Sequence, residues 1–345
     1  MHDEAAMPAR LAAYLTGLDA GGRTATITAY RPIVGGYSRL MARADVAWSD
    51  GSAETIVLRG DPPPGKSMME TDRDREWALL TVLRDAVRMP APRHYDDAGQ
   101  SLGTKCIVLE HVDGPSLQAV LTSLPAGDDG IVDYGRHTGD LVDTMAALHG
   151  VDPAVADGVL DRPVNWDDYL GGLIDRFRQA DAGHVEAVPF LRYAAAWLDA
   201  NRPPPLPLRL VHSDFQTSNI VLDAAGAHHL VDWELTHVGD PREDLGYYNV
   251  YASAVGPNLY ADDPEAFLAR YRERTGFGED AVNVSTMGYF SSLAAITVYA
   301  QVLGGAAAMA RGQNSGLMTT YTINALTVGH GNFMSACVAP AAAAA

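Results

Sequence analysis

A predicted hairpin in the second half of the chain narrows the choice of fold more than any other segment. Short strand-like runs at 219–222 and 228–233 flank a turn at 224–226, and such runs around a short turn predict paired antiparallel strands. Asp214 and Asn219 lie on the segment that enters the hairpin, and Asp232 lies at the end of its second strand. The hairpin is therefore expected to bring two carboxylates and one amide together.

These three side chains predict a particular chemistry. Oxygen ligands gathered in this way suit a hard divalent cation, so Asn219 and Asp232 are expected to hold magnesium. Asp214 then stays free to accept a proton. Phosphoryl transfer needs both parts, because a metal neutralises the phosphates and a carboxylate orients the attacking hydroxyl.

Two longer patterns surround these residues. The first, His-x-Asp-x-x-x-x-Asn, begins at His212, and the second combines Val-Asp-Trp-Glu at 231–234 with Gly-Asp-Pro at 239–241 and Asp-Leu at 244–245. Together they resemble the signatures of the aminoglycoside phosphotransferase and choline kinase-like family. Within that family the chain is most similar to the branch that includes the kinase-like domains of certain acyl-CoA dehydrogenase family members.

The resemblance implies an α+β, bilobal, protein-kinase-like fold. A small antiparallel β-rich lobe over residues 1–113 would bind the nucleotide, and a mainly helical lobe over 114–345 would carry the catalytic loop and the substrate site. It also implies an ATP- and Mg²⁺-dependent enzyme that phosphorylates a hydroxyl group of a small molecule. Asp214 would be the catalytic base, and Asn219 and Asp232 would be the magnesium ligands.

The patterns of the first 113 residues agree with such a small lobe. Runs at 24–30, 39–48 and 54–59 alternate with turn residues and predict an antiparallel meander. A helix is expected at 70–87 and a further strand at 106–110, which gives a β-rich lobe with one helix.

The nucleotide contacts are expected from two backbone segments of this lobe. Gly35, Gly36 and Ser38 lie between the first two strands, where glycines let backbone N–H groups approach phosphate oxygens. The run at 108–114 resembles the family's hinge, where Glu110 would offer a backbone carbonyl and Val112 an N–H group to adenine.

Arg59 departs from the family pattern, which usually has a lysine at this position. By resemblance Arg59 would bind the nucleotide phosphates, with Glu76 on the following helix as its ion-pair partner. Arginine binds phosphate through two nitrogens, but it is not a neutral replacement for lysine. Lys66 in the next loop is an inferior substitute.

Helices are expected from residue 116 onward. Apolar residues at 141, 142, 145 and 148 form one helical stripe, and further helices are expected at 166–179, 189–201 and from 240 to about 336. His212, Asp240 and Asp244 are interpreted as structural. Substrate-lining candidates are Asp167, Asp168, Glu234, Glu243 and Tyr247, although solvated surface is the favoured interpretation of each.

Composition limits the partners. The net charge of −18 argues against binding to nucleic acid, and the uncharged stretch at 287–310 has the composition of a buried helix rather than a membrane span. Two cysteines and no apparent signal peptide lead us to expect a cytoplasmic protein.

Several alternatives remain open at this point. The acceptor could be an aminoglycoside-like compound, an amino alcohol or a hydroxylated metabolite. The unusual Arg59 and the incomplete glycine pattern also fit a nucleotide-binding pseudokinase with a regulatory or scaffold role. A protein kinase is disfavoured, because no extended activation segment follows Asp232.

Overall fold

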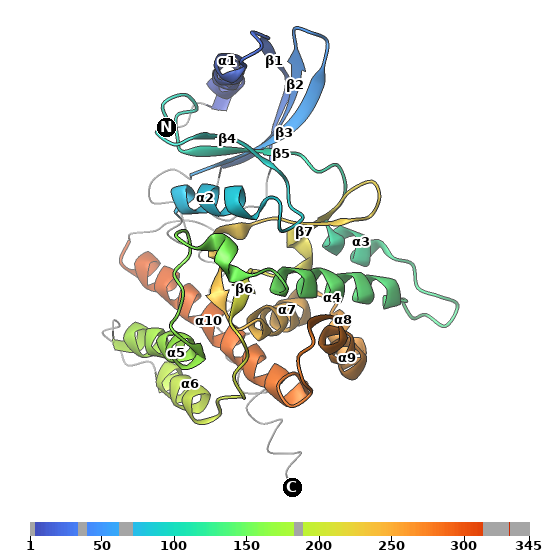
Figure 1. Ribbon diagram of the computed structural model, residues 1–345, viewed down its shortest axis with the longest axis vertical. Helices are drawn as coiled ribbons and strands as arrows, with labels where there is room; N and C mark the ends of the chain where they lie inside the picture. The colour runs from blue at the N-terminus through green and yellow to red at the C-terminus, as the bar shows by residue number, and fades with distance from the viewer. Residues whose placement is uncertain (1–3, 34–39, 62–71, 183–188, 313–330, 332–345) are drawn as a thin grey trace.

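The chain forms a small β-sheet lobe stacked on a larger helical lobe (Figure 1). The computed structural model describes residues 4–33, 40–61, 72–182, 189–312 and 331. This arrangement confirms the expected α+β, bilobal fold. The predicted phosphate-binding residues Gly35, Gly36 and Ser38, and also Lys66, lie outside the described residues.

The small lobe is built on a five-stranded antiparallel sheet with the order β1-β2-β3-β5-β4. The predicted meander is confirmed, since β1, β2 and β3 pair in sequence order. The strands are β1 (Ala25–Pro32), β2 (Leu40–Trp48), β3 (Ala53–Gly60), β4 (Pro92–Asp96) and β5 (Cys106–Glu110).

Helices cover both faces of this sheet. On one face of the sheet, Val108 shares a buried cluster with three residues of α1 (Met7–Leu18), namely Met7, Leu11 and Leu15. On the other face, Ile107 belongs to the core that contains α2 (Arg73–Leu83). Neighbouring residues of a strand point to opposite faces, so α1 and α2 lie on opposite sides. The expectation of one helix in this lobe was wrong: the described part has two, because α1 was overlooked.

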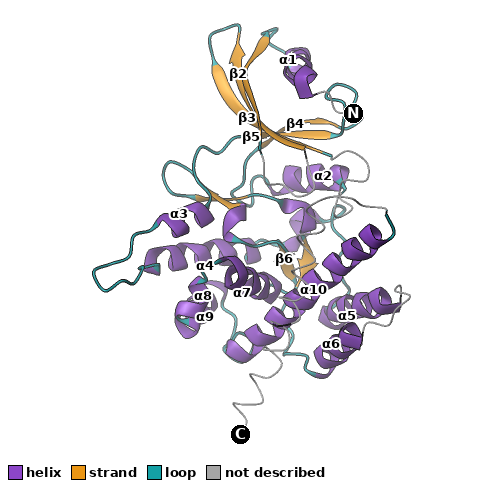
Figure 2. Ribbon diagram, turned by 180° about the vertical axis from the view of Figure 1, so that it is seen from behind, coloured by secondary structure: helices purple, strands orange, loops and turns teal. Residues whose placement is uncertain are grey.

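The large lobe consists of helices around two short antiparallel strand pairs, β6 with β9 and β7 with β8. Figure 2 shows this predominance of helix from behind. Its elements are α3 (Leu117–Ser123), α4 (Gly135–His149), α5 (Trp166–Ala182), α6 (Pro189–Ala200), β6 (Arg209–Val211), β7 (Ile220–Leu222), β8 (His228–Leu230), β9 (His237–Gly239), α7 (Arg242–Val255), α8 (Leu259–Asp262), α9 (Pro264–Thr275) and α10 (Val284–Ala310).

The predicted apolar stripe of α4 is confirmed, since Leu141, Val142, Met145 and Leu148 are all buried. They join the main core, which reaches from α2 through the strand pairs to α9. That core supports the underside of the segment from β6 to β9, on which the predicted site residues lie.

A second core joins α5 and α6 to α10. Phe290, Leu293 and Ile296 of α10 are buried in it, as expected for an internal helix. Among the helices that the structure describes, none combines the length and apolar character that crossing a bilayer requires.

Candidate active site

The predicted hairpin is confirmed and brings the ends of its strands together. Ile220 of β7 pairs with Leu230 of β8, and the backbone N–H of Val231 donates to the carbonyl oxygen of Asn219 at 3.0 Å. Asn219, just before β7, and Asp232, just after β8, are therefore held close together at the end of the hairpin opposite its turn.

Asp214 lies in front of this hairpin and is bound by two amides. Asn219 donates from Nδ2 to the Asp214 backbone oxygen at 3.0 Å and to Oδ2 at 2.7 Å, and Gln216 donates from Nε2 to Oδ1 at 2.7 Å. Since Asn219 uses its nitrogen for Asp214, its side-chain oxygen is the atom it presents to a cation. One asparagine thus connects the candidate base to the candidate metal site.

Burial raises the pKa of the Asp214 carboxyl above its ordinary value, although the side chain keeps partial access to solvent. The nearby Asp232 charge raises this pKa further, and hydrogen bonds from Tyr247 and Asn219 oppose the shift. A raised pKa makes the carboxylate a better proton acceptor. Tyr247, one of the predicted lining residues, therefore reaches the candidate base itself.

The backbone before Asp214 is held by a buried carboxylate. Ser213 adopts the left-handed conformation with φ = 66°, which is uncommon for residues other than glycine. Asp244 accepts hydrogen bonds from the backbone N–H groups of His212 at 2.9 Å and Ser213 at 2.8 Å. Asp244 is itself anchored by Nε2 of His149 at 3.1 Å. These contacts fit the structural interpretation of His212 and Asp244.

Asp240, the other aspartate interpreted as structural, is fully buried away from Asp214. It accepts from the Trp166 indole N–H at 2.7 Å and pairs with Arg242 at 2.6 Å. These bonds join the start of α5 to the start of α7.

Asp232 is also left-handed, with φ = 71°, and it faces Arg59 of the small lobe. Arg59 Nη2 lies 2.5 Å from Asp232 Oδ1, and Arg59 Nε lies 2.6 Å from Glu76 Oε1. Glu234 Oε2 is 3.7 Å from the same Nη2 atom. The structure therefore places Arg59 beside Glu76, as expected. It also places Arg59 in an ion pair with Asp232, the predicted metal ligand.

The charge of this network suits a cation. Its described members carry five carboxylates, on Asp61, Glu76, Asp214, Asp232 and Glu234, against two guanidinium groups, on Arg59 and Arg73. Among the described residues, no group of three His, Cys, Asp or Glu side chains could hold a metal unaided. The Asp232 carboxylate and the Asn219 amide are a partial ligand set, as expected when phosphate oxygens complete the coordination of Mg²⁺.

The predicted hinge residues follow the last strand of the sheet. Glu110 ends β5, and its backbone N–H donates to the Ala91 carbonyl at 2.9 Å. His111 then donates to Thr55 at 3.3 Å, and Val112 lies in the extended link toward α3. This link connects the two lobes.

Three other predicted lining residues have local structural partners. Asp168 accepts from the backbone N–H of Val164 at 3.0 Å, before α5. Asp167 is largely exposed and lies 3.5 Å from Arg202. Glu243 lies 2.9 Å from Nε2 of His237. Burial alone would lower the pKa of that histidine, but the charge and hydrogen bond of Glu243 outweigh burial and raise it.

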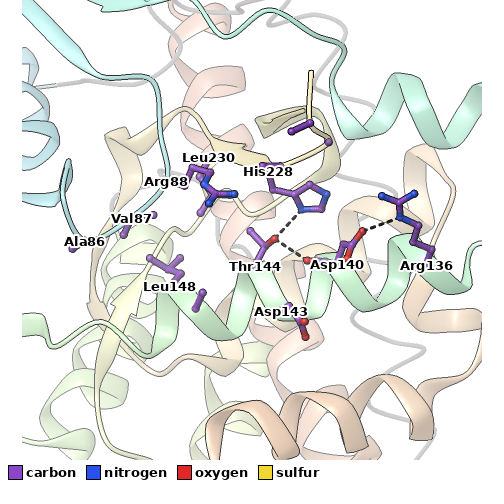
Figure 3. A pocket seen from close by; sticks show the side chains of 14 residues that line it. Ala86, Val87, Arg88, Arg136, Asp140, Asp143, Thr144, Leu148, His228 and Leu230 are labelled. Atoms are coloured by element: carbon purple, nitrogen blue, oxygen red, sulfur yellow. Dashed lines mark hydrogen bonds and ion pairs between the residues drawn. The ribbon is translucent and has the colours of Figure 1, made fainter. Parts of the chain in front are cut away.

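A separate cavity of about 500 Å³ lies behind the hairpin, between the end of α2, α4 and the β7–β8 turn (Figure 3). Leu230 donates from its backbone to Arg88 at 3.0 Å. Nδ1 of His228 lies 2.8 Å from the Thr144 hydroxyl, which donates to the Asp140 carbonyl. These bonds fix the back of the hairpin that carries Asn219 and Asp232.

Comparison with known proteins relates this geometry to phosphotransferases. The model of the phosphotransferase enzyme family matches residues 30–283. Acyl-CoA dehydrogenase family member 11 of Rattus norvegicus is 27% identical over 204 residues, covering 58% of this chain and 25% of that protein. Family member 10 of Mus musculus is 26% identical over 202 residues, covering 56% of this chain and 18% of that protein. The chain thus matches only a quarter or less of these relatives' length.

Solved structures with the same fold include several kinases. A choline/ethanolamine kinase family protein from Mesorhizobium loti has a TM-score of 0.61 at 17% identity, covering 96% of this chain and 98% of that one. Macrolide 2'-phosphotransferase from Brachybacterium faecium has a TM-score of 0.59 at 19% identity, covering 93% and 98%. A thermostable mutant aminoglycoside phosphotransferase, in a ternary complex with ADP and hygromycin B, has a TM-score of 0.61 at 12% identity, covering 95% and 97%.

Proposed function

Because this chain belongs to the phosphotransferase enzyme family, we propose that it transfers the terminal phosphoryl group of ATP to a hydroxyl group of a small molecule. The observation that carries the proposal is Asn219, whose side-chain nitrogen binds the Asp214 carboxylate at 2.7 Å while its backbone oxygen accepts from Val231, the residue before Asp232. A proton acceptor and an oxygen-rich cation site are thus adjacent, as phosphoryl transfer requires.

The proposed reaction starts with the acceptor hydroxyl hydrogen-bonded to Asp214. Asp214 orients this hydroxyl and takes its proton as the oxygen forms a bond to the γ-phosphorus. The bond from that phosphorus to the β,γ-bridging oxygen breaks, and ADP leaves with the electron pair. Gln216 and Asn219 keep the carboxylate in place throughout, since each binds a different carboxylate oxygen.

Asn219 and Asp232 are the residues that would hold Mg²⁺. When bound, the metal ion would neutralise phosphate charge. The surplus of carboxylates around Asp232 supports this assignment, because ATP alone would add negative charge to a region that is already acidic.

We further propose that residues 1–113 and 114–345 act as nucleotide-binding and substrate-binding lobes. The backbone of Glu110 and Val112 would contact adenine, and Gly35, Gly36 and Ser38 would cover the phosphates. The acceptor classes to be compared are aminoglycosides, amino alcohols and hydroxylated metabolites. Hygromycin B and ethanolamine appear in the names of proteins with this fold, and they are sensible first members of a panel.

The decisive experiment measures acceptor-dependent ATP turnover for the wild type and Asp214→Asn. The variant keeps the size of the side chain but removes the proton acceptor, so we expect turnover to fall by about 10²–10⁴-fold. Asp85→Asn is the matched control, because this carboxylate is 91% exposed and lies two residues after the end of α2. Equal turnover by wild type and Asp214→Asn would remove Asp214 from its proposed role.

A pseudokinase remains the second candidate, and the ion pair between Arg59 and Asp232 favours it, because that pair satisfies Asp232 without a metal. Calorimetry of ATP binding with and without Mg²⁺ separates the two functions. ATP binding that is indifferent to Mg²⁺, together with no turnover on the panel, would support the pseudokinase.

A further inference from the structure

Arg59 contacts the candidate metal ligand and the small-lobe glutamate with different nitrogens. Its Nε atom lies 2.6 Å from Glu76, and its Nη2 atom lies 2.5 Å from Asp232. The Arg59 side chain is 4% exposed, so little water screens either pair. Glu76 is 2% exposed and is held from its other oxygen by Arg73.

This geometry depends on the fork of the guanidinium group. Arginine has several N–H donors in a fixed plane, whereas lysine carries one compact ammonium group. A single ammonium has less reach to bind Glu76 and Asp232 in these separate directions. The arginine at a position where the family usually has lysine is therefore what closes the contact to Asp232.

We propose that Arg59 occupies Asp232 in place of the metal, so that a divalent cation and Arg59 compete for this one carboxylate. The proposal rests on the function proposed above for the same site. When Asp232 binds a cation instead of Arg59, Arg59 keeps its bond to Glu76. The Nη2 atom of Arg59 is then free to bind a phosphate oxygen. Arg59 thereby exchanges one anionic partner for another and never becomes an unpaired buried charge, which would be costly.

Competition of this kind couples the binding of nucleotide and metal. A cation alone must break the Arg59–Asp232 pair without offering Arg59 a new partner. ATP alone gives Arg59 a phosphate, but brings the negative polyphosphate close to the Asp232 carboxylate. When both bind, the cation pairs with Asp232 and a phosphate oxygen pairs with Arg59, so each is expected to tighten the binding of the other by the same factor.

The test measures Mn²⁺ binding to the nucleotide-free protein by electron paramagnetic resonance, which detects free Mn²⁺ and requires no activity. Arg59→Lys should bind Mn²⁺ about tenfold more tightly than the wild type, within the range usual for coupled sites, because lysine stays on Glu76 and releases Asp232. Arg73→Lys is the matched control: Arg73 is buried against the same Glu76, but its ion pairs are to Glu76 and Asp61. It should leave the affinity within about twofold of the wild type.

A second variant predicts the opposite change. Glu76→Gln removes the competing anion, so Arg59 binds Asp232 more firmly, and the affinity for Mn²⁺ should fall about threefold or more. Circular dichroism melting checks that each variant is folded, and the Glu76→Gln result decides the question should Arg59→Lys not fold. Equal Mn²⁺ affinity in the wild type and the folded variants overturns the proposal.

These outcomes are distinct from those that test the overall reaction. If Arg59→Lys binds Mn²⁺ more tightly and Glu76→Gln binds it more weakly, but the protein transfers no phosphate to any acceptor, the proposed function is contradicted and the competition is supported. A protein that phosphorylates an acceptor in an Asp214-dependent way, with no such shifts, would keep the function and contradict the competition.

Discussion

Asp244 determines the conformation of the loop before Asp214, although it is remote from any reacting atom. Its two carboxylate oxygens accept from the backbones of consecutive residues, His212 and Ser213, and one of them also binds His149. Asp244 is fully buried, so each of these bonds forms in a poorly solvated environment. They stabilise the left-handed backbone at Ser213, immediately before Asp214.

Replacing Asp244 with asparagine should therefore destabilise the protein. One acceptor oxygen becomes an amide that faces a buried N–H donor, and the free energy of unfolding should fall by about 2–3 kcal/mol. Urea unfolding at pH 7 measures the change, and Asp85→Asn controls for loss of an exposed carboxylate. A loss no greater than that of the control would contradict this role.

The same variant makes a signed prediction about pH. Burial alone would raise the pKa of Asp244, but the hydrogen bond and charge of His149 outweigh it, so the pKa is lower than the ordinary value of 3.8. A lowered pKa stabilises the fold above that ordinary value, and this contribution is lost as pH falls through the folded-state pKa. The difference in stability between wild type and Asp244→Asn should accordingly shrink below pH 3.8. A constant difference down to pH 3 would mean that the charge of Asp244 is unimportant.

Single residues were predictable from the sequence where the chemistry is local. Asp214, Asn219 and Asp232 lie within one short segment, so their spacing alone indicated that they meet. The contact of Arg59 with Asp232 joins residues 173 positions apart, and no local pattern encodes such a pair. Glu243 was predicted to line the substrate site, but it lies beside His237, six residues away. A carboxylate in the sequence is therefore a weak indicator of a substrate site, because a nearby residue can already be its partner.

At the scale of elements, α7 links the loop before Asp214 to the long helix α10. Asp244 is directed at the loop, while Gly246 lies against α10, where an added Cβ atom would overlap the backbone of Phe290. The two helices pack with their backbones in close contact at this point. A side chain at Gly246 would have to push α7, and Asp244 with it, away from α10.

Gly246→Ala should therefore destabilise the protein by about 1–3 kcal/mol, the usual cost of overpacking. Gly288→Ala is the matched control on α10, since a Cβ atom there meets nothing within 4 Å; it should be neutral or stabilise the helix by about 0.5–1 kcal/mol. Urea unfolding of both variants gives the comparison. Similar values for the two substitutions would contradict the close approach.

Several elements with strong local signals were predicted, whereas short elements that depend on distant partners were missed. The stripe of α4 and the β7–β8 hairpin follow from their own residues. By contrast, β6 and β9 have three residues each and pair Arg209 with Gly239, so they depend on a distant partner. The spacing of Met7, Leu11 and Leu15 was a readable helix signal for α1, and it was overlooked because small alanines separate these residues.

At the scale of the whole molecule, α2 and Arg59 bind the two lobes to each other. Leu79 and Leu83 of α2 belong to the main core with the helices of the large lobe. Arg75 donates to the Thr236 carbonyl at 2.6 Å, and Arg59 reaches Asp232. The small lobe is therefore attached through an apolar contact and through charged groups that a nucleotide would meet.

Binding of nucleotide with metal should consequently stabilise the whole molecule. ATP with Mg²⁺ at about 100 times its dissociation constant should add about 2.7 kcal/mol to the free energy of unfolding, which a thermal denaturation scan detects as a higher midpoint. ATP with EDTA should give a much smaller shift, because the polyphosphate then meets Asp214, Asp232 and Glu234 without a counter-ion. Equal shifts with and without Mg²⁺ would show that the carboxylates around Asp232 do not form a cation site.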